Sequence, residues 1–231
     1  MDGLLINWGH QLALGTAVTV ALALATLPFG LVFGLTAALA KDSKFAAVRA
    51  AGEGYTTIFR GLPELLTLLL IYYGSQILTQ NLSDWSGLPV TINVSPFMAG
   101  VIALSLVFGA YSSEVFLGAL RGVERGQIEC ARSFGMNPAL VFRRVTAPQM
   151  FRIALPGLGN NWLVLLKDTS LVSVIALDDL LRVTSVAVES TRKPFEFYAA
   201  ACAIYLAMTA ISTLAIAWME RHARYGWRQA A

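Results

Sequence analysis

Long apolar stretches separated by short polar segments dominate this chain. A helix needs roughly 20 residues to cross a hydrocarbon core of about 30 Å. Five stretches approach or exceed that length, and we expect membrane-spanning helices at residues 12–40, 56–78, 97–120, 153–177 and 195–219. The second stretch is strongly apolar only from Leu62, and we extend it back to Thr56 to reach a spanning length. The pattern therefore predicts a bundle of helices within a membrane.

Composition agrees with this pattern. The chain has 231 residues, of which 56% are hydrophobic and only 13% charged, with a mean hydropathy of +0.63. These values exclude an ordinary soluble domain and indicate an all-α integral membrane protein, organised as a single transmembrane domain over residues 1–231. No basic segment precedes the first apolar stretch, so we expect that stretch to be an uncleaved span.

Positive charge is distributed unevenly between the polar segments. Thirteen of the 17 Lys and Arg residues fall in residues 41–60, 121–152 and the C-terminal tail, which an odd number of spans places on one side of the membrane. The positive-inside rule then puts the N-terminus outside and the C-terminus in the cytoplasm. The same asymmetry explains the pI of about 9.0. No basic patch with interleaved aromatics suggests a nucleic-acid partner.

The polar segment 121–152 carries the signals of a helical hairpin. Residues 127–134 can form a short helix with Ile128, Ala131 and Phe134 on one face. Gly135 suits a left-handed residue that ends this helix, and Asn137-Pro138 suits the cap and first turn of a second short helix. The segment could be a knob that docks into a partner or a surface hairpin without one.

This hairpin resembles the cytoplasmic EAA loop of ABC importer permeases. The family pattern is Glu-Ala-Ala, three residues, Gly, nine residues, Ile, one residue and Leu-Pro, and Glu129, Ala131, Gly135 and Pro148 stand at the expected positions. The departures are Cys130, Val145 and Ala147, which are all apolar. The resemblance implies a coupling loop at 121–152 that docks on an ATPase through Glu129, Cys130, Ala131, Gly135 and Pro148.

Three further motifs extend the resemblance in order along the chain. They are Phe59-Arg60-Gly61-Leu62-Pro63-Glu64 running into the second span, Ala110-Tyr111-Ser112-Ser113-Glu114, and Leu155-Pro156-Gly157-Leu158-Gly159-Asn160-Asn161-Trp162 with Leu166-Lys167-Asp168-Thr169-Ser170. Together they look like polar amino-acid permeases, most of all the Q-type subunit of histidine, lysine, arginine, ornithine and opine importers. Leu117 and Glu124 depart from the wider family, which puts the transfer of charge pairs around the loop in doubt.

The resemblance implies a five-span type I ABC importer permease in the bacterial inner membrane, with a periplasmic N-terminus. Its partners would be membrane lipid, a second related permease, two ATPases that bind ATP and Mg, and a periplasmic binding protein. A homodimeric permease core is the architectural variant. The chain shows no phosphate-binding loop, metal-ligand cluster or activated nucleophile, so we expect it to be non-catalytic and to hold no cofactor or metal. The rival interpretations are an ATP-independent secondary transporter or channel and, less favoured, a membrane enzyme.

Polar groups within the spans are candidates for a substrate pathway, because a charge at mid-bilayer costs about 2.5 to 3.5 kcal/mol and must face protein, water or another charge. The candidates are Glu114, Glu64, Asn160, Asn161, Lys167 and Asp168. For Glu64 we favour neutralisation of Arg60, four residues earlier on one helix. Glu114 lacks an obvious local partner, so it could line a pathway or anchor the third span to the loop. For Lys167 and Asp168 we favour pairing with other elements or a partner subunit over substrate contact.

Overall fold

The computed structural model describes residues 2–86 and 94–225, and all regular structure in these ranges is helical. The Arg228 side chain, one of the basic groups used above for orientation, lies outside them. The elements are α1 (Asp2–Lys41), α2 (Ala46–Gly61), α3 (Glu64–Ser86), α4 (Pro96–Arg121), α5 (Arg125–Ser133), α6 (Pro138–Val141), the π-helical η1 (Phe142–Thr146), α7 (Ala147–Asp168), the 3₁₀-helical η2 (Thr169–Ile175), α8 (Leu180–Thr191) and α9 (Pro194–Tyr225).

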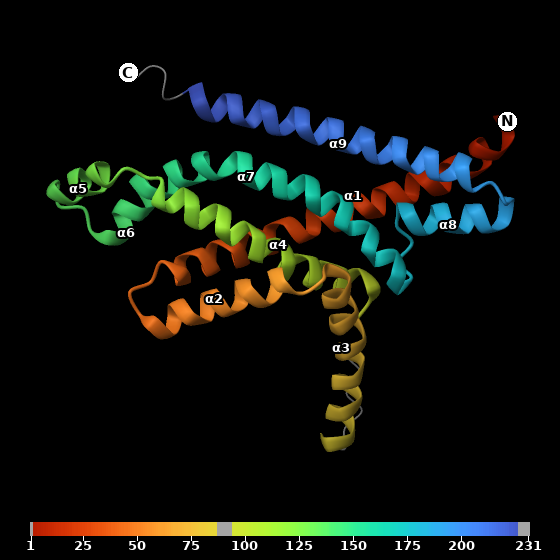
Figure 1. The fold of residues 1–231 in the computed structure, drawn as a ribbon, viewed down its shortest axis with the longest axis horizontal. Helices are drawn as coiled ribbons and strands as arrows, with labels where there is room; N and C mark the ends of the chain where they lie inside the picture. The colour runs from red at the N-terminus through yellow and green to blue at the C-terminus, as the bar shows by residue number, and fades with distance from the viewer. Residues whose placement is uncertain (1, 87–93, 226–231) are drawn as a thin grey trace.

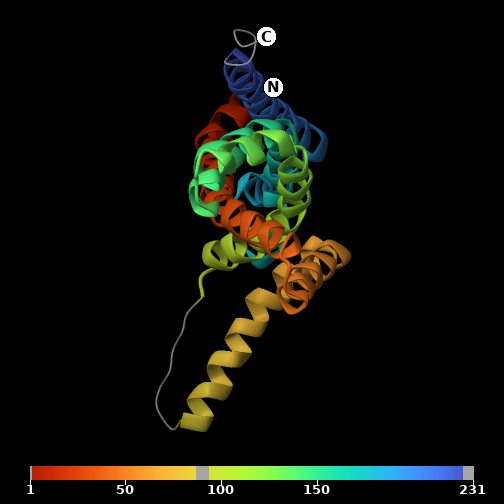
Figure 2. The same ribbon diagram turned by 90° about the vertical axis from the view of Figure 1, so that its left-hand side faces the viewer.

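The long helices α1, α4 and α7 lie alongside one another, and α9 follows one side of them (Figure 1). The beginning of α1 and helix α8 lie at one end of this bundle, and α5 and α6 lie at the other. Seen along the bundle, α3 projects away from the other helices (Figure 2). The α1–α2 connection also lies at the α5–α6 end, so the beginning of the basic segment 41–60 lies near the basic segment 121–152.

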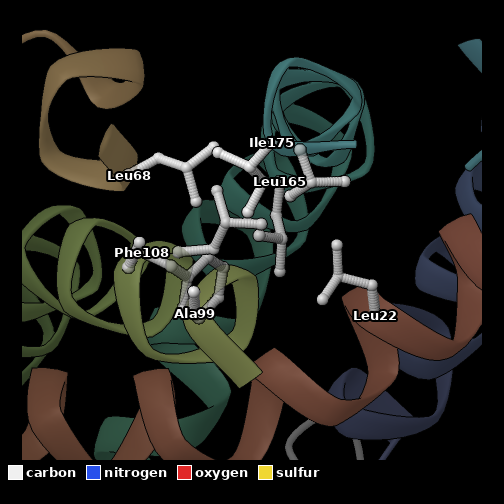
Figure 3. Packing of buried hydrophobic residues seen from close by; sticks show 9 residues of the cluster. Leu22, Leu68, Ala99, Phe108, Leu165 and Ile175 are labelled. Carbon is white, nitrogen blue, oxygen red and sulfur yellow. The ribbon is translucent and has the colours of Figure 1, made fainter. Parts of the chain in front are cut away.

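A cluster of buried apolar side chains joins five of these elements. Leu22 of α1, Leu68 of α3, Phe108 of α4, Leu165 of α7 and Ile175 of η2 pack together in it (Figure 3). Each is at most 5% exposed, so burial of this apolar surface stabilises the arrangement even though α3 leaves the bundle. The cluster fixes the first turns of α3 against α4 and α7, and thereby positions Glu64.

Helices α1 and α4 pack closely because small residues face each other. A Cβ atom added at Gly34 would lie 2.9 Å from the Ser112 Cβ and 3.0 Å from the Gly109 carbonyl oxygen. Small residues at such positions let helix backbones approach within a membrane, where van der Waals packing supplies much of the helix–helix attraction. The close contact between α1 and α4 therefore leaves no room for a side chain at position 34. A Cβ atom at the exposed Gly118, by contrast, would meet nothing within 4 Å.

Replacing Gly34 with valine is expected to lower the stability of the bundle by about 1–3 kcal/mol, because the added atoms force α1 and α4 apart. The measurement is the thermal unfolding midpoint of the purified protein in detergent, compared with Gly118→Ala. The control adds a methyl group to α4 at a position with open space and should keep the wild-type midpoint or exceed it. A wild-type midpoint for Gly34→Val would contradict the close-packing argument.

The expected uninterrupted helix over residues 56–78 is wrong. Helix α2 ends at Gly61, Leu62 is extended with φ −88° and ψ 141°, and α3 begins at Glu64 at an angle of 104° to α2. The reason is local, since the ring of Pro63 disfavours a helical backbone at the residue before it. By length and composition, the described helices that could each cross a membrane are Trp8–Lys41, Pro96–Arg121 and Pro194–Ala223, with the bent pair α2–α3 as a fourth if it counts as one span.

The helix expected at 153–177 has different limits in the structure. Helix α7 already begins at Ala147 and ends at Asp168, and the chain then tightens into the 3₁₀ helix η2. Ala176 follows in a left-handed conformation with φ 60°. Among the described residues, this segment is not one of those apolar enough to qualify as a span, in keeping with its amide and charged side chains near the C-terminal end of α7.

Candidate functional site

The hairpin at the end of the bundle has the predicted glycine turn. Gly135 has φ +78°, a left-handed value that carries no penalty without a Cβ atom. Its N–H donates to the Arg132 carbonyl at 2.9 Å, and the Met136 N–H donates to the Ala131 carbonyl at 3.3 Å. These bonds satisfy carbonyl groups at the end of α5. The expected role of Gly135 as the residue that ends the first short helix is confirmed.

The second half of the hairpin is only partly as expected. The Asn137 side-chain oxygen accepts a hydrogen bond from the Leu140 N–H at 2.9 Å, and Pro138 is the first residue of α6, as predicted. However, α6 is not a separate short helix, because it continues through the π turn η1 directly into α7. Pro148 has no N–H to donate to the carbonyl four residues earlier, which accounts for the wider turn at this point.

The exposed surface of the hairpin comes mainly from α5 and its end. Glu129 and Cys130 are exposed, whereas Ala131 is buried. Phe134 is 79% exposed, so the expectation that it shares the inner face with Ile128 and Ala131 is wrong. Phe134 caps the C-terminus of α5, where the chain turns away before Gly135, and its ring is left projecting outward. The hairpin thus presents an exposed acid and an aromatic ring.

Helix α5 is attached to the bundle by two contacts. Ile128 packs against the buried cluster that contains Phe116 of α4 and Met150 of α7. The Gln149 side-chain amide of α7 donates to the Gln127 side-chain oxygen at 2.6 Å. The elements α6, η1 and α7 are also continuous, so the hairpin leads directly into α7.

A pocket with polar and apolar lining residues lies between α3, α4 and α7, with a volume of about 290 Å³. Four of the candidate residues predicted from the sequence line it: Glu64, Asn160, Asn161 and Asp168. Its other lining residues are Tyr111 and a wall of apolar side chains, Leu104, Val107, Phe108, Val164 and Leu165. The fold therefore gathers these polar groups from three helices into one cavity.

Few of these polar groups are satisfied within the chain. The Asn161 amide donates to the Ser112 hydroxyl at 3.3 Å, and the Tyr111 hydroxyl donates to Glu64 Oε1 at the long distance of 3.5 Å. Within the described ranges, neither Glu64 nor Asp168 forms an ion pair, although Asp168 is close enough to Glu64 and to the exposed Lys167 for both charges to influence it electrostatically. Two unpaired carboxylates beside apolar walls suit a ligand that combines positive charge with an aliphatic chain.

Tyr111 was not among the residues singled out from the sequence. It lies in the motif Ala110-Tyr111-Ser112-Ser113-Glu114, of which only Glu114 was predicted to line a substrate pathway. Tyr111 and Glu114 lie on the same side of α4, about one helical turn apart along its axis. Only the position of α3 and α7 along α4 decides which of the two side chains lines the pocket, and the sequence carries no signal for it.

Glu114 and Lys167 do not line the pocket. Glu114 Oε1 accepts hydrogen bonds from Lys41 Nζ at 2.8 Å and from Arg60 Nη1 at 2.7 Å, so its partners are remote in sequence. The predicted neutralisation of Arg60 by Glu64 is wrong, because the bend at Leu62–Pro63 takes the two residues off a common helix face. Lys167 is exposed and, in the part of the chain that the structure describes, has no ion-pair partner, so the pairing expected for it is not seen within the chain.

Apolar spanning helices, a cavity between them that is lined by two carboxylates, and an exposed helical hairpin at one end are typical of a membrane transport subunit. The sequence model of the family described as "Binding-protein-dependent transport system inner membrane component" matches residues 30–225. The chain belongs to this family. It is a transmembrane permease subunit of an ABC importer, and the ATP-independent secondary transporter or channel considered above is not favoured.

The sequence of this chain is similar to those of its relatives over nearly their whole length. The octopine transport system permease protein OccQ of Rhizobium radiobacter is 42% identical over 206 residues, covering 89% of this chain and 87% of that protein. The histidine/lysine/arginine/ornithine transport system permease protein HisQ of Salmonella typhimurium is 41% identical over 216 residues, with 94% of each chain covered. The arginine ABC transporter permease protein ArtQ of Escherichia coli is 44% identical over 219 residues, with 90% and 92% covered.

Solved structures show the same architecture. A chain from the crystal structure of an amino acid ABC transporter with histidines has a TM-score of 0.80 and 33% identity, with 96% of this chain and 99% of that chain covered. A chain of the MetNI methionine ABC transporter in an inward facing conformation has a TM-score of 0.76 at 15% identity, with the same coverage, and supports the fold alone.

Proposed function

We propose that this permease carries cationic amino acids or opines across the bacterial inner membrane, and that the pocket between α3, α4 and α7 is the site they pass through. The observation that carries the proposal is the pair of carboxylates, Glu64 and Asp168, which line the pocket without an ion-pair partner among the described residues. A guanidinium or ammonium group would pair with them, and this pairing would offset its loss of hydration.

The remaining lining fits the rest of such a substrate. Asn160 and Asn161 offer amide groups that can donate to a carboxylate and accept from an ammonium. The apolar wall formed by residues such as Leu104 and Val164 can bury an aliphatic side chain. Relatives whose names refer to octopine, to arginine and to histidine, lysine, arginine and ornithine support this substrate class.

The hairpin would couple transport to a separate ATPase. Glu129, Cys130, Ala131, Gly135 and Pro148 form or support it, and the exposed Phe134 adds an apolar contact for a docking groove. Helix α7 begins at this hairpin and ends at Asp168 in the pocket. A closing movement of the ATPases could thereby reach the pocket through one continuous helix and change its access.

The complete importer would contain this chain, a second homologous permease, two ATPases and a periplasmic binding protein, within membrane lipid. ATP and Mg would be bound by the ATPases, and this chain would hold no cofactor or metal. We place five crossings, with the bent α2–α3 pair and the α7–η2 segment as the second and fourth. A cytoplasmic position for the hairpin is supported by the basic segment 121–152 and the beginning of the basic segment 41–60, which lie at its end of the bundle (Figure 1).

The test of this proposal is transport by the purified assembly. The permease, expressed with its neighbouring genes, should copurify with an ABC ATPase, and proteoliposomes containing the complex should accumulate L-arginine only with binding protein and ATP present. L-glutamate is the matched control, because two carboxylates in the pocket would repel it. A gently solubilised complex without any ATPase would refute the importer assembly, and ATP-dependent uptake of glutamate but not arginine would refute the substrate class.

A further inference from the structure

Arg60 stands directly beside the pocket without lining it. It belongs to the last turn of α2, two residues before the bend at Leu62–Pro63, and its guanidinium carbon lies 5.6 Å from the centre of the Tyr111 ring. Tyr111 lines the pocket, and its hydroxyl contacts Glu64. The ring of Tyr111 thus contacts a cation outside the pocket, and its hydroxyl contacts a carboxylate within it.

The structure holds Arg60 in this position through Glu114. The Arg60 guanidinium donates to Glu114 Oε1 at 2.7 Å, and the same oxygen accepts from Lys41 at 2.8 Å. The cluster therefore contains two cations and one anion. Lys41 is only 8% exposed, whereas the Arg60 side chain is 44% exposed and has room to move.

We propose that Arg60 is a restrained internal competitor of the substrate, and that Glu114 is the positioning residue that keeps the site free by holding the Arg60 guanidinium away from Glu64. The inference rests on the proposed cationic substrate. If the Glu114 charge is lost, Lys41 and Arg60 repel each other, and the buried Lys41 cannot leave. Arg60 then moves across Tyr111 to Glu64, which the Tyr111 hydroxyl contacts and which has no ion pair among the described residues.

An intramolecular cation at Glu64 would compete with every cationic substrate. Apparent affinity falls in proportion to the fraction of permease that keeps its site free, so occupation by Arg60 for nine-tenths of the time weakens binding tenfold. Glu114 therefore affects binding although it does not line the pocket. In this role Glu114 holds Arg60 in place and does not contact the substrate itself.

The experiment measures equilibrium binding of radiolabelled L-arginine to the purified permease–ATPase complex in lipid nanodiscs, without binding protein. Glu114→Gln should raise the Kd about tenfold. The double variant Arg60→Gln/Glu114→Gln lacks the same carboxylate but also lacks the competitor, and its Kd should return to within about twofold of wild type. Arg60→Gln alone should bind like wild type. Melting temperatures of the variants identify any loss of folded protein.

Two results would overturn the inference alone. One is a wild-type Kd for Glu114→Gln in folded complex, and the other is a double variant that binds as weakly as Glu114→Gln, which would show that Glu114 acts structurally or contacts the substrate itself. If the wild-type complex does not bind L-arginine or another cationic amino acid or opine but binds a neutral or acidic amino acid, the proposed substrate class fails, and this inference fails with it.

Discussion

Replacement of Asp168 with asparagine should weaken binding and uptake of L-arginine by at least about tenfold, or roughly 1.4 kcal/mol. Asp168 is the last residue of α7 and lines the pocket beside apolar side chains, where an ion pair gains strength from the exclusion of water. Asparagine keeps the shape of the side chain and removes the charge. Glu64 would remain, so the double variant Glu64→Gln/Asp168→Asn should lose arginine binding almost completely.

The matched control for this experiment is Asp178→Asn. It makes the same change at an exposed carboxylate that does not line the pocket. Arginine binding by purified complex and uptake by proteoliposomes should both remain near wild type for this control. If Asp168→Asn binds arginine as the wild type does, while folding normally, the pocket carboxylates do not recognise the substrate and selectivity must come from the binding protein.

Replacement of Gly135 with valine should uncouple transport from ATP hydrolysis, with uptake reduced at least about tenfold at normal protein level. The φ of +78° at this residue is unfavourable for any side chain and most of all for a β-branched one, at a cost on the order of 1–3 kcal/mol. The turn would open, α5 would change its angle to α6, and the surface offered to the ATPase would be lost. Membrane insertion should not change, because the hairpin lies at the end of the bundle (Figure 1).

The control for this variant is Gly54→Val in α2. A Cβ atom meets nothing within 4 Å at either position, and a left-handed φ distinguishes Gly135. The measurements are uptake, ATPase activity stimulated by loaded binding protein, and the amount of ATPase that copurifies. Normal uptake by Gly135→Val at a normal protein level would exclude the hairpin as the coupling element. A comparable loss in Gly54→Val would point to general destabilisation instead.

Local features of the sequence predicted the class of the protein and the turn of its hairpin. Membrane helices are encoded by runs of about 20 apolar residues. The ends of helices are encoded by capping residues that lie within about one turn of the helix end. Gly135 and Asn137 act in the structure as their local sequence indicates. The effect of Pro63 is just as local, because a proline disfavours a helical backbone at the residue before it, but the apolar pattern alone carries no signal for this break.

Tertiary packing decided which polar groups meet. Glu64, Tyr111 and Asp168 reach one pocket only because α3, α4 and α7 pack through the cluster around Phe108 and Leu165. Glu114 finds its cations on α1 and α2, which its own helix does not specify. An ion pair or a pocket depends on the relative phase and tilt of several helices, and these follow from close packing at positions such as Gly34 across the whole bundle. Sequence patterns of a few residues carry no measure of that phase, so the polar candidates were evident from the chain, but their partners appeared only in the folded protein.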